Sequence, residues 1–102
     1  MTDSQTRGAD ILLKAYDLIT GDRHNSYAHP SEDYARTAAI FKAATGHNLT
    51  VEEAILFMIC VKMSRLVNEM NTNQWIPDNA TDAAGYLGCL QMVRENRNVI
   101  PE

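Results

Sequence analysis

Apolar residues recur along this chain at intervals of three and four positions, the spacing that places them on one face of an α-helix. Four stretches show the pattern, at residues 10–19, 31–45, 51–71 and 79–93. No alternating β-branched stretch of strand length and no internal repeat interrupts them. The sequence therefore predicts one all-α domain over residues 1–102, a bundle of about four helices.

Residues that favour helix boundaries lie at the ends of these stretches. Gly21 and Gly46 follow the first and second stretches, where a glycine readily ends a helix. Thr50 begins the third stretch with an acid three residues later, which is the pattern of a capping box. Asp78 or Asn79 can cap the fourth. The start of the third helix is the clearest of these boundaries.

The third stretch should form the most buried helix, because residues 55–61 are apolar on every side of it. We predict that it is the central helix of the bundle. The first and second helices are too short to cover it completely. We therefore expect a homodimer or a higher homo-oligomer that buries the remaining apolar surface.

Charge and composition exclude several classes of partner. Nine Lys and Arg against thirteen Asp and Glu give a net charge of −4, which disfavours general binding to nucleic acid or to an anionic membrane. The longest apolar run, residues 55–61, is far shorter than the roughly 20 residues of a membrane span, and the N-terminus is polar. We therefore expect a cytoplasmic protein. Cys60 and Cys89 are expected to be small buried residues and not zinc ligands.

The predicted connection at residues 21–30 is unusually rich in hydrogen-bonding side chains. Two interpretations are open for it. These groups cap helix ends or face water, or they bind a ligand. In the second case Arg23 binds phosphate, Tyr27 or His29 stacks on a base or sugar, and His24 lies beside them. The helix that follows would also offer free backbone N–H groups to an anion.

A charged pair, Lys62 and Arg65, directly follows the most apolar part of the chain and shares a helix face with Glu69. One interpretation is an interhelical ion pair with Asp82, because a cation near a buried segment needs an acidic partner. In the alternative, Lys62 and Arg65 line a pocket for a phosphate-bearing ligand. Asp78 and Asp82, one turn apart, would then hold a divalent metal through oxygen ligands.

The same segments resemble a small domain family of unknown function that is common in tailed phages and prophages. The likeness keeps its order along most of the chain, although Ala28 stands where that family usually has glycine. It implies a protein of the infected or lysogenic host cell. The matching runs are Gly21-Asp22-Arg23 with Tyr27-Ala28-His29-Pro30, Asp33-Tyr34 with Arg36-Thr37, Val61-Lys62-Met63-Ser64-Arg65, and Asp78-Asn79 with Asp82-Ala83-Ala84-Gly85-Tyr86.

That phage family in turn is similar to the MazG-like nucleotide pyrophosphohydrolases. These are all-α oligomers that hold magnesium with acidic residues and cleave nucleoside triphosphates between the α and β phosphates. In that class one helix carries an ExxE pair and the next an ExxD pair. Here Asn79 and Asp82 match only the second pair, and Lys62 and Arg65 stand near the place of the first. The exchange implies poor metal binding and phosphate binding that needs no metal.

The leading hypothesis is therefore a phage nucleotide-binding protein of MazG-like descent that regulates a nucleotide pool or sequesters a nucleotide signal. One alternative is a Mg²⁺-dependent nucleoside triphosphate pyrophosphohydrolase in which Asp78 and Asp82, with Glu69 or Asp33 as a further ligand, hold the metal. Another is a structural or partner-binding helical module. The expected ligand contacts are Arg23, His24, Tyr27, His29, Lys62, Arg65, Asn79 and Tyr86.

Overall fold

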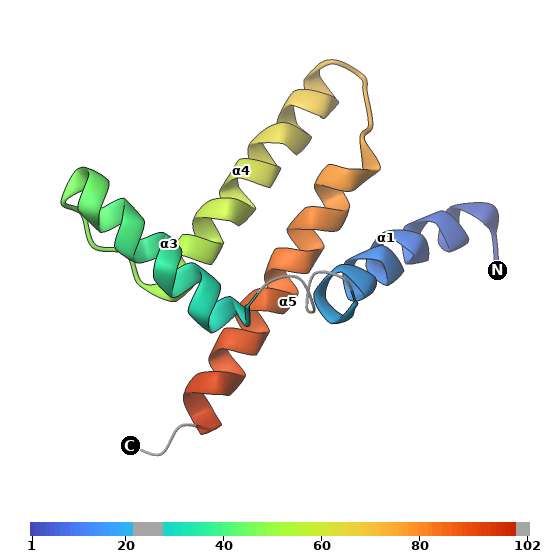
Figure 1. The fold of residues 1–102 in the computed structure, drawn as a ribbon. Helices are drawn as coiled ribbons and strands as arrows, with labels where there is room; N and C mark the ends of the chain where they lie inside the picture. Colours follow the sequence, from blue (N-terminus) through green and yellow to red (C-terminus); the bar gives the residue numbers. More distant parts are fainter. Residues whose placement is uncertain (22–27, 100–102) are drawn as a thin grey trace.

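Four helices are present in the part of the chain that the structure describes (Figure 1), as the spacing of the apolar residues predicts. The computed structural model describes residues 1–21 and 28–99, and side chains as far as residue 96. No strand occurs within those ranges, so the all-α prediction is confirmed. The helices are α1 (Asp3–Thr20), α3 (Pro30–Thr45), α4 (Val51–Asn71) and α5 (Pro77–Val99).

Local capping interactions fix most of the helix boundaries. Thr50 and Glu53 form the predicted capping box, with 3.0 Å between the Glu53 N–H and the Thr50 hydroxyl. Thr2 caps α1 in the same way, which is why this helix starts before residue 10, where the apolar pattern begins. Gly46 ends α3 with a φ of 80°, a conformation that glycine adopts without strain. The predicted cap at the start of α5 is wrong by two or three residues, because the helix already begins at Pro77 and Asp78 and Asn79 lie inside it.

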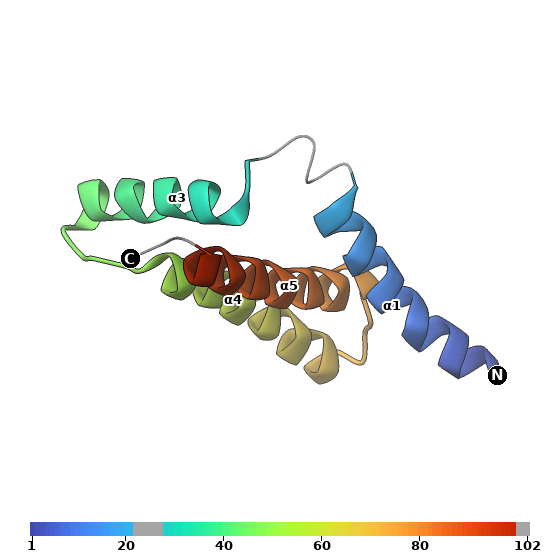
Figure 2. The same cartoon turned by 90° about the horizontal axis from the view of Figure 1, so that it is seen from below.

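The connection between α4 and α5 is short, so the two helices lie side by side and antiparallel (Figure 1). On its other side α5 packs against α1. Figure 2 shows α3 lying over the layer that α4 and α5 form. α5 therefore contacts each of the other three helices, whereas α1 contacts neither α3 nor α4 over the described residues.

The prediction that the third helix, α4, is the buried centre of the fold is wrong. Only α3 and α5 cover α4, and its outer side carries large apolar residues that are more than half exposed, such as Leu56, Val67 and Met70. Cys60 is also exposed, contrary to expectation, while Cys89 is buried as predicted. An apolar residue on every side of a helix predicts burial only if enough neighbouring helices are present. In this chain α5 has them and α4 does not.

The core lies where α3, α4 and α5 meet. It is formed by Tyr34, Ala54, Ile55, Cys89 and Val93. The rings of Tyr34 and Tyr86 meet edge to face there, with centroids 6.4 Å apart. On the opposite side of α5, Gly88 lets α1 approach closely, because a Cβ at that position would lie 2.8 Å from Ile19.

The molecule is open in shape, with principal extents of 48 × 30 × 23 Å. Its radius of gyration of 15.6 Å exceeds the roughly 13 Å typical of a compact domain of this length. None of the helices in the described part of the chain combines the length and apolar character needed to cross a membrane.

Candidate functional site

Four polar or charged side chains meet between α4 and α5, where a helix pair would ordinarily be apolar. Lys62 and Glu69 are two turns apart on one face of α4, and Asn79 and Asp82 are one turn apart on α5. Since the two helices run antiparallel, Lys62 lies opposite Asp82 and Glu69 lies opposite Asn79.

Lys62 and Asp82 form an interhelical ion pair, with 2.8 Å between Nζ and Oδ2. The lysine side chain is only 11% exposed and that of the aspartate 35%. A buried ammonium without a counter-ion would be costly, so the pair holds both side chains in place. Of the two interpretations that the sequence leaves open for Lys62, the ion pair is the one present in the structure.

Glu69 is a buried carboxylate, only 1% exposed, at the end of α4. Its Oε1 accepts hydrogen bonds from the backbone N–H of Ile76 and from Nδ2 of Asn79, the latter at 3.4 Å. These bonds join α4 to the start of α5. Its other oxygen, Oε2, is buried and has no hydrogen-bond partner among the described residues. From the sequence, Glu69 was expected to share a helix face with Lys62 and to be a possible metal ligand, and its role in joining the two helices was not predicted. An acid at the end of an apolar helix was a signal of that role.

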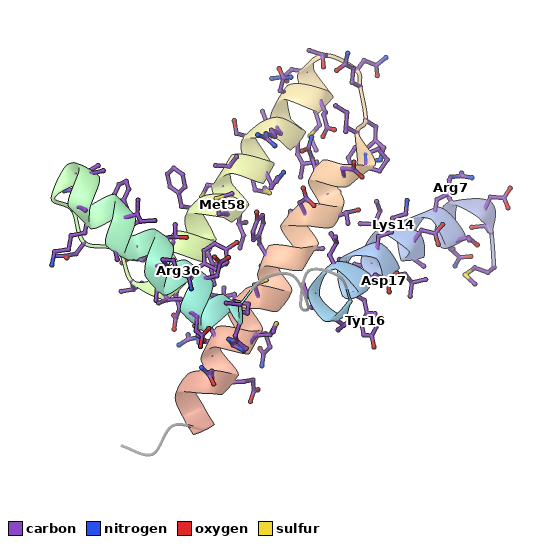
Figure 3. The ribbon with its side chains drawn as sticks, viewed as in Figure 1. Arg7, Lys14, Tyr16, Asp17, Arg36 and Met58 are labelled. Atoms are coloured by element: carbon purple, nitrogen blue, oxygen red, sulfur yellow. The ribbon has the colours of Figure 1, made fainter. Side chains whose placement is uncertain are left out.

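A groove of about 410 Å³ runs between the second half of α1 and the start of α5. Its volume falls within the roughly 300–1,000 Å³ of small-molecule sites. Thr81 in its wall is only 4% exposed, and the Thr81 hydroxyl makes no hydrogen bond within the described part of the chain. Figure 3 shows where Lys14 and Asp17 stand on α1. We call this feature the α1–α5 groove; it is lined by Lys14, Asp17, Leu18, Asp78, Thr81 and Asp82.

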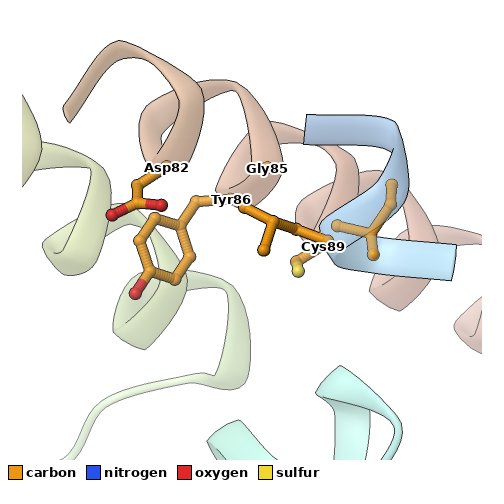
Figure 4. A pocket seen from close by; sticks show the side chains of 6 residues that line it. Asp82, Gly85, Tyr86 and Cys89 are labelled. Atoms are coloured by element: carbon orange, nitrogen blue, oxygen red, sulfur yellow. The ribbon is translucent and has the colours of Figure 1, made fainter. Parts of the chain in front are cut away.

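A smaller pocket of about 60 Å³ adjoins the α1–α5 groove, and Leu18 and Asp82 line both. Figure 4 shows the carboxylate of Asp82 and the ring of Tyr86 extending to the same side of α5. Gly85 and Cys89 lie further along that helix. Asp82 thus stands at the junction of the two cavities while it is bound to Lys62.

Among the described residues, carboxylates dominate the charge of the α1–α5 groove, because three aspartates and one lysine line it. A carboxylate accepts hydrogen bonds and repels a free phosphate. No three His, Cys, Asp or Glu side chains of the described residues come together closely enough to hold a metal ion. Asp78 and Asp82 both border the groove, yet Asp78 is exposed and Asp82 is bound to Lys62. Metal binding by these two residues stays a prediction.

Of the predicted contacts in the first interhelix connection, only His29 lies within the described residues; Arg23, His24 and Tyr27 lie outside them. The Nδ1 atom of His29 accepts a hydrogen bond from the backbone N–H of Ser31 at 3.1 Å. His29 therefore caps α3 and occupies one of the N–H groups that an anion would need.

The remaining predicted contact residues do not lie together: two are at least partly buried and one is exposed. Asn79 is buried and bonded to Glu69, and Tyr86 packs in the core while also lining the smaller pocket. Arg65 is exposed on α4 and lines neither cavity. Thr81 belongs to no sequence motif. Only the packing of α1 against α5 reveals its place in the groove.

Comparison with known proteins connects the chain to phages. The model of a family described as a domain of unknown function, DUF6378, matches residues 10–94. The Gene 55 protein of Mycobacterium phage D29 is 31% identical over 85 residues, which cover 83% of this chain and 54% of that protein. For the Gene 55 protein of Mycobacterium phage L5 the identity is 31%, over 82% of this chain and 52% of that protein. The chain thus spans about half the length of these relatives. No solved structure gives a significant match.

Proposed function

We propose that this chain, which belongs to the DUF6378 family of phage-associated domains, binds a phosphate-bearing small molecule in the α1–α5 groove. A nucleotide is the first candidate. We further propose that the chain binds it as a homo-oligomer in the cytoplasm of the infected or lysogenic host cell. One observation carries the proposal. The groove gathers hydrogen-bonding groups that packing does not use, among them the buried hydroxyl of Thr81.

These groups match the chemistry of a nucleotide. The ammonium of Lys14 is a donor for phosphate oxygens or for a base carbonyl. The hydroxyl of Thr81 is a second donor, buried in the wall of the groove, and a ligand reaches it by displacing the atoms that cover it. The three carboxylates of the groove accept hydrogen bonds from ribose hydroxyls, a pairing that dinucleotide-binding proteins also use, or from an exocyclic amino group. Leu18 adds an apolar wall on which part of the ligand can rest.

The ion pair changes the part that Lys62 plays in this proposal. Since its ammonium is bound to Asp82, Lys62 orients that carboxylate, and among the described lining residues Lys14 is the cation left to contact phosphate. Arg23, also expected to contact phosphate, lies outside the described residues. With one cation and three carboxylates among its described lining residues, the groove favours a ligand of low negative charge, such as a nucleoside monophosphate or a cyclic nucleotide. A triphosphate would need a divalent cation to offset the repulsion.

We also propose that the chain descends from the MazG-like enzymes. The all-helical fold supports it, as do Asn79 and Asp82, one turn apart at the start of α5. A Mg²⁺-dependent pyrophosphohydrolase is the alternative, favoured by the carboxylates around the groove. Because no three of the described side chains form a metal-binding group, we assign no catalytic step to them. Binding without turnover would suit sequestration of a nucleotide or of a nucleotide signal.

A melting-temperature panel tests the proposal and separates it from the alternative. The protein is heated with nucleoside mono-, di- and triphosphates and cyclic nucleotides, each with and without Mg²⁺. Stabilisation by monophosphates or cyclic nucleotides without Mg²⁺ is the expected result, because a ligand that binds only the folded state raises its stability. Stabilisation only with Mg²⁺, together with pyrophosphate release, would favour the enzyme. A panel without any shift would overturn the proposal.

Thr81→Val should keep the fold and lose the ligand. The hydroxyl has no partner to lose on folding, so its removal should leave the free energy of unfolding unchanged or raise it by about 1 kcal/mol. Ligand affinity should fall about tenfold, as expected when a hydrogen bond to a charged group is removed. Urea unfolding and ligand titration measure the two effects. The control for the ligand titration is Thr45→Val, whose exposed hydroxyl lies on α3 and bonds to the backbone of Phe41 and His47. Unchanged affinity in the Thr81 variant would remove the groove from the proposal.

Asp78→Asn distinguishes direct phosphate binding from binding through a metal. Without Mg²⁺, loss of one carboxylate should raise the affinity for an anionic ligand about threefold, because an exposed like charge is removed. Isothermal titration with the nucleotide selected by the panel measures the change. Asp3→Asn is the control, because Asp3 is an exposed acid in the first turn of a helix, as Asp78 is, and lies outside the groove. A fall in affinity seen only in the presence of Mg²⁺ would show that Asp78 acts as a metal ligand.

A further inference from the structure

An exposed apolar stripe runs along the outer side of α4. Its residues follow one another at intervals of four and three positions, and four of the five are more than half exposed. The fifth, Cys60, is exposed as well. We call this surface the α4 stripe; it consists of Leu56, Cys60, Met63, Val67 and Met70. Alternation of four and three is the spacing by which a helix packs lengthwise against another helix.

No other helix of the chain covers the α4 stripe, since α4 packs only against α3 and α5 within the described residues. Five apolar side chains exposed to this degree form one contiguous patch of roughly 500 Å², as large as the largest patches on typical monomers. Two such patches pressed together would bury about 1,000 Å², the least area expected of a biological interface. The stripe is therefore just large enough for a small dimer interface.

The stripe is complementary to itself when two copies run antiparallel. With a twofold axis at Met63, Met63 faces its own copy and Leu56 of one copy faces Met70 of the other. Cys60 and Val67 lie opposite Leu66 and Ile59, two partly buried apolar residues that flank the stripe. Every pair formed in this register is apolar. A symmetric dimer requires such self-complementarity, because the same patch is used by both copies.

Charge also favours the antiparallel orientation over the parallel one. Glu52 and Glu53 lie at the start of α4, whereas its last turn, residues 68–71, contains one acid, the buried Glu69. A parallel pair would bring the exposed Glu53 of both copies to the same end, where like charges repel. Glu52 adds less to this repulsion, because Arg94 lies 3.7 Å from it. A parallel pair would also align the two helix dipoles side by side. An antiparallel pair keeps these carboxylates at opposite ends of the interface.

We propose that two copies of this chain associate through the α4 stripe, with the two α4 helices antiparallel and crossing at Met63. The inference deepens the homo-oligomer part of the proposed function and rests on it. It does not depend on the α1–α5 groove, which is formed by α1 and α5. A dimer could therefore form even if the protein bound no nucleotide, and the two proposals can fail separately.

Light scattering after gel filtration, without any ligand, tests the interface. The wild-type protein should have twice the chain mass of 11.4 kDa, whereas Met63→Glu should have the mass of one chain at equal helicity by circular dichroism. Leu13→Glu is the matched control, because it makes the same kind of change at an exposed apolar site on α1, and it should remain dimeric. A monomeric wild-type protein or a dimeric Met63→Glu variant would overturn the proposal, as would dissociation of the Leu13 control.

Disulfide crosslinking tests the relative orientation of the two α4 helices. Its variants add no charge, so they avoid the loss of fold that an added glutamate can cause. In a Cys60→Ser background, Met63→Cys should crosslink to a dimer on mild oxidation, because the antiparallel register places the two new thiols beside the twofold axis. Val67→Cys in the same background faces Ile59 and should stay uncrosslinked. Crosslinking of both variants would show parallel helices, and crosslinking of neither would show that the stripe is not the interface.

Discussion

Replacing Lys62 with alanine should lower the free energy of unfolding by about 3 kcal/mol, because the carboxylate of Asp82 loses the ammonium 2.8 Å away and stays at a partly buried position. The cost should lie below the upper end for buried pairs, since Asp82 is 35% exposed and water can reach it. Urea unfolding at one fixed protein concentration measures the change, so that any self-association contributes equally to both proteins.

Two further variants show whether the ion pair is the cause. Lys42→Ala removes an exposed lysine from α3 and should change the stability by no more than about 0.5 kcal/mol. The double variant Lys62→Met with Asp82→Leu should recover most of the lost stability, because both charges leave the interface together. An equally large loss in the double variant would mean that Lys62 stabilises the fold through its packing and not through Asp82.

Ile55→Ala should cost about 3–4 kcal/mol of stability, because Ile55 is fully buried, at 0% exposure, in the core between α3, α4 and α5. Truncation of a buried isoleucine removes apolar contacts and leaves a cavity that a close-packed core fills only in part. The measurement is again urea unfolding at fixed protein concentration.

Ile40→Ala is the matched control for this variant. Ile40 also lies within a helix but is 64% exposed, so the change in helix propensity is the same and the change in burial is not. Its effect should stay within about 0.5 kcal/mol. Equal losses at the two positions would contradict the core described here and would mean that α4 does not pack on α3 and α5 at Ile55.

The ion pair and the groove connect stability to the proposed binding. Asp82 accepts the ammonium of Lys62 on one side and lines both cavities on the other. Loss of Lys62 should therefore weaken ligand binding indirectly, through an Asp82 side chain that is no longer held. Loss of Thr81 should weaken it directly. The Lys62 variant should be less stable than the wild-type protein, whereas the Thr81 variant should not. That difference separates a positioning residue, Lys62, from a ligand contact, Thr81.

Recognition of the candidate site from the sequence succeeded for some residues and failed for others. Lys62 and Asp82 stood out, because a cation after an apolar run needs a partner on another helix. Thr81 and Lys14 did not, since neither has an unusual neighbour along the chain. Their place in the groove depends on which face of α1 meets α5, and Gly88 makes that contact close without belonging to any site motif.

By itself the sequence determined the helices, the phage-family resemblance and several helix ends such as the capping box at Thr50. Helix spacing and caps depend on residues three or four positions apart, so they can be read from the chain directly. Only the tertiary structure decided that α5 and not α4 is central, that Glu69 joins the two helices, and that the α4 stripe is left exposed. Each of these depends on which helices are present to cover a given face. That choice is made by contacts between residues far apart in sequence, for which apolar spacing within one helix carries no information.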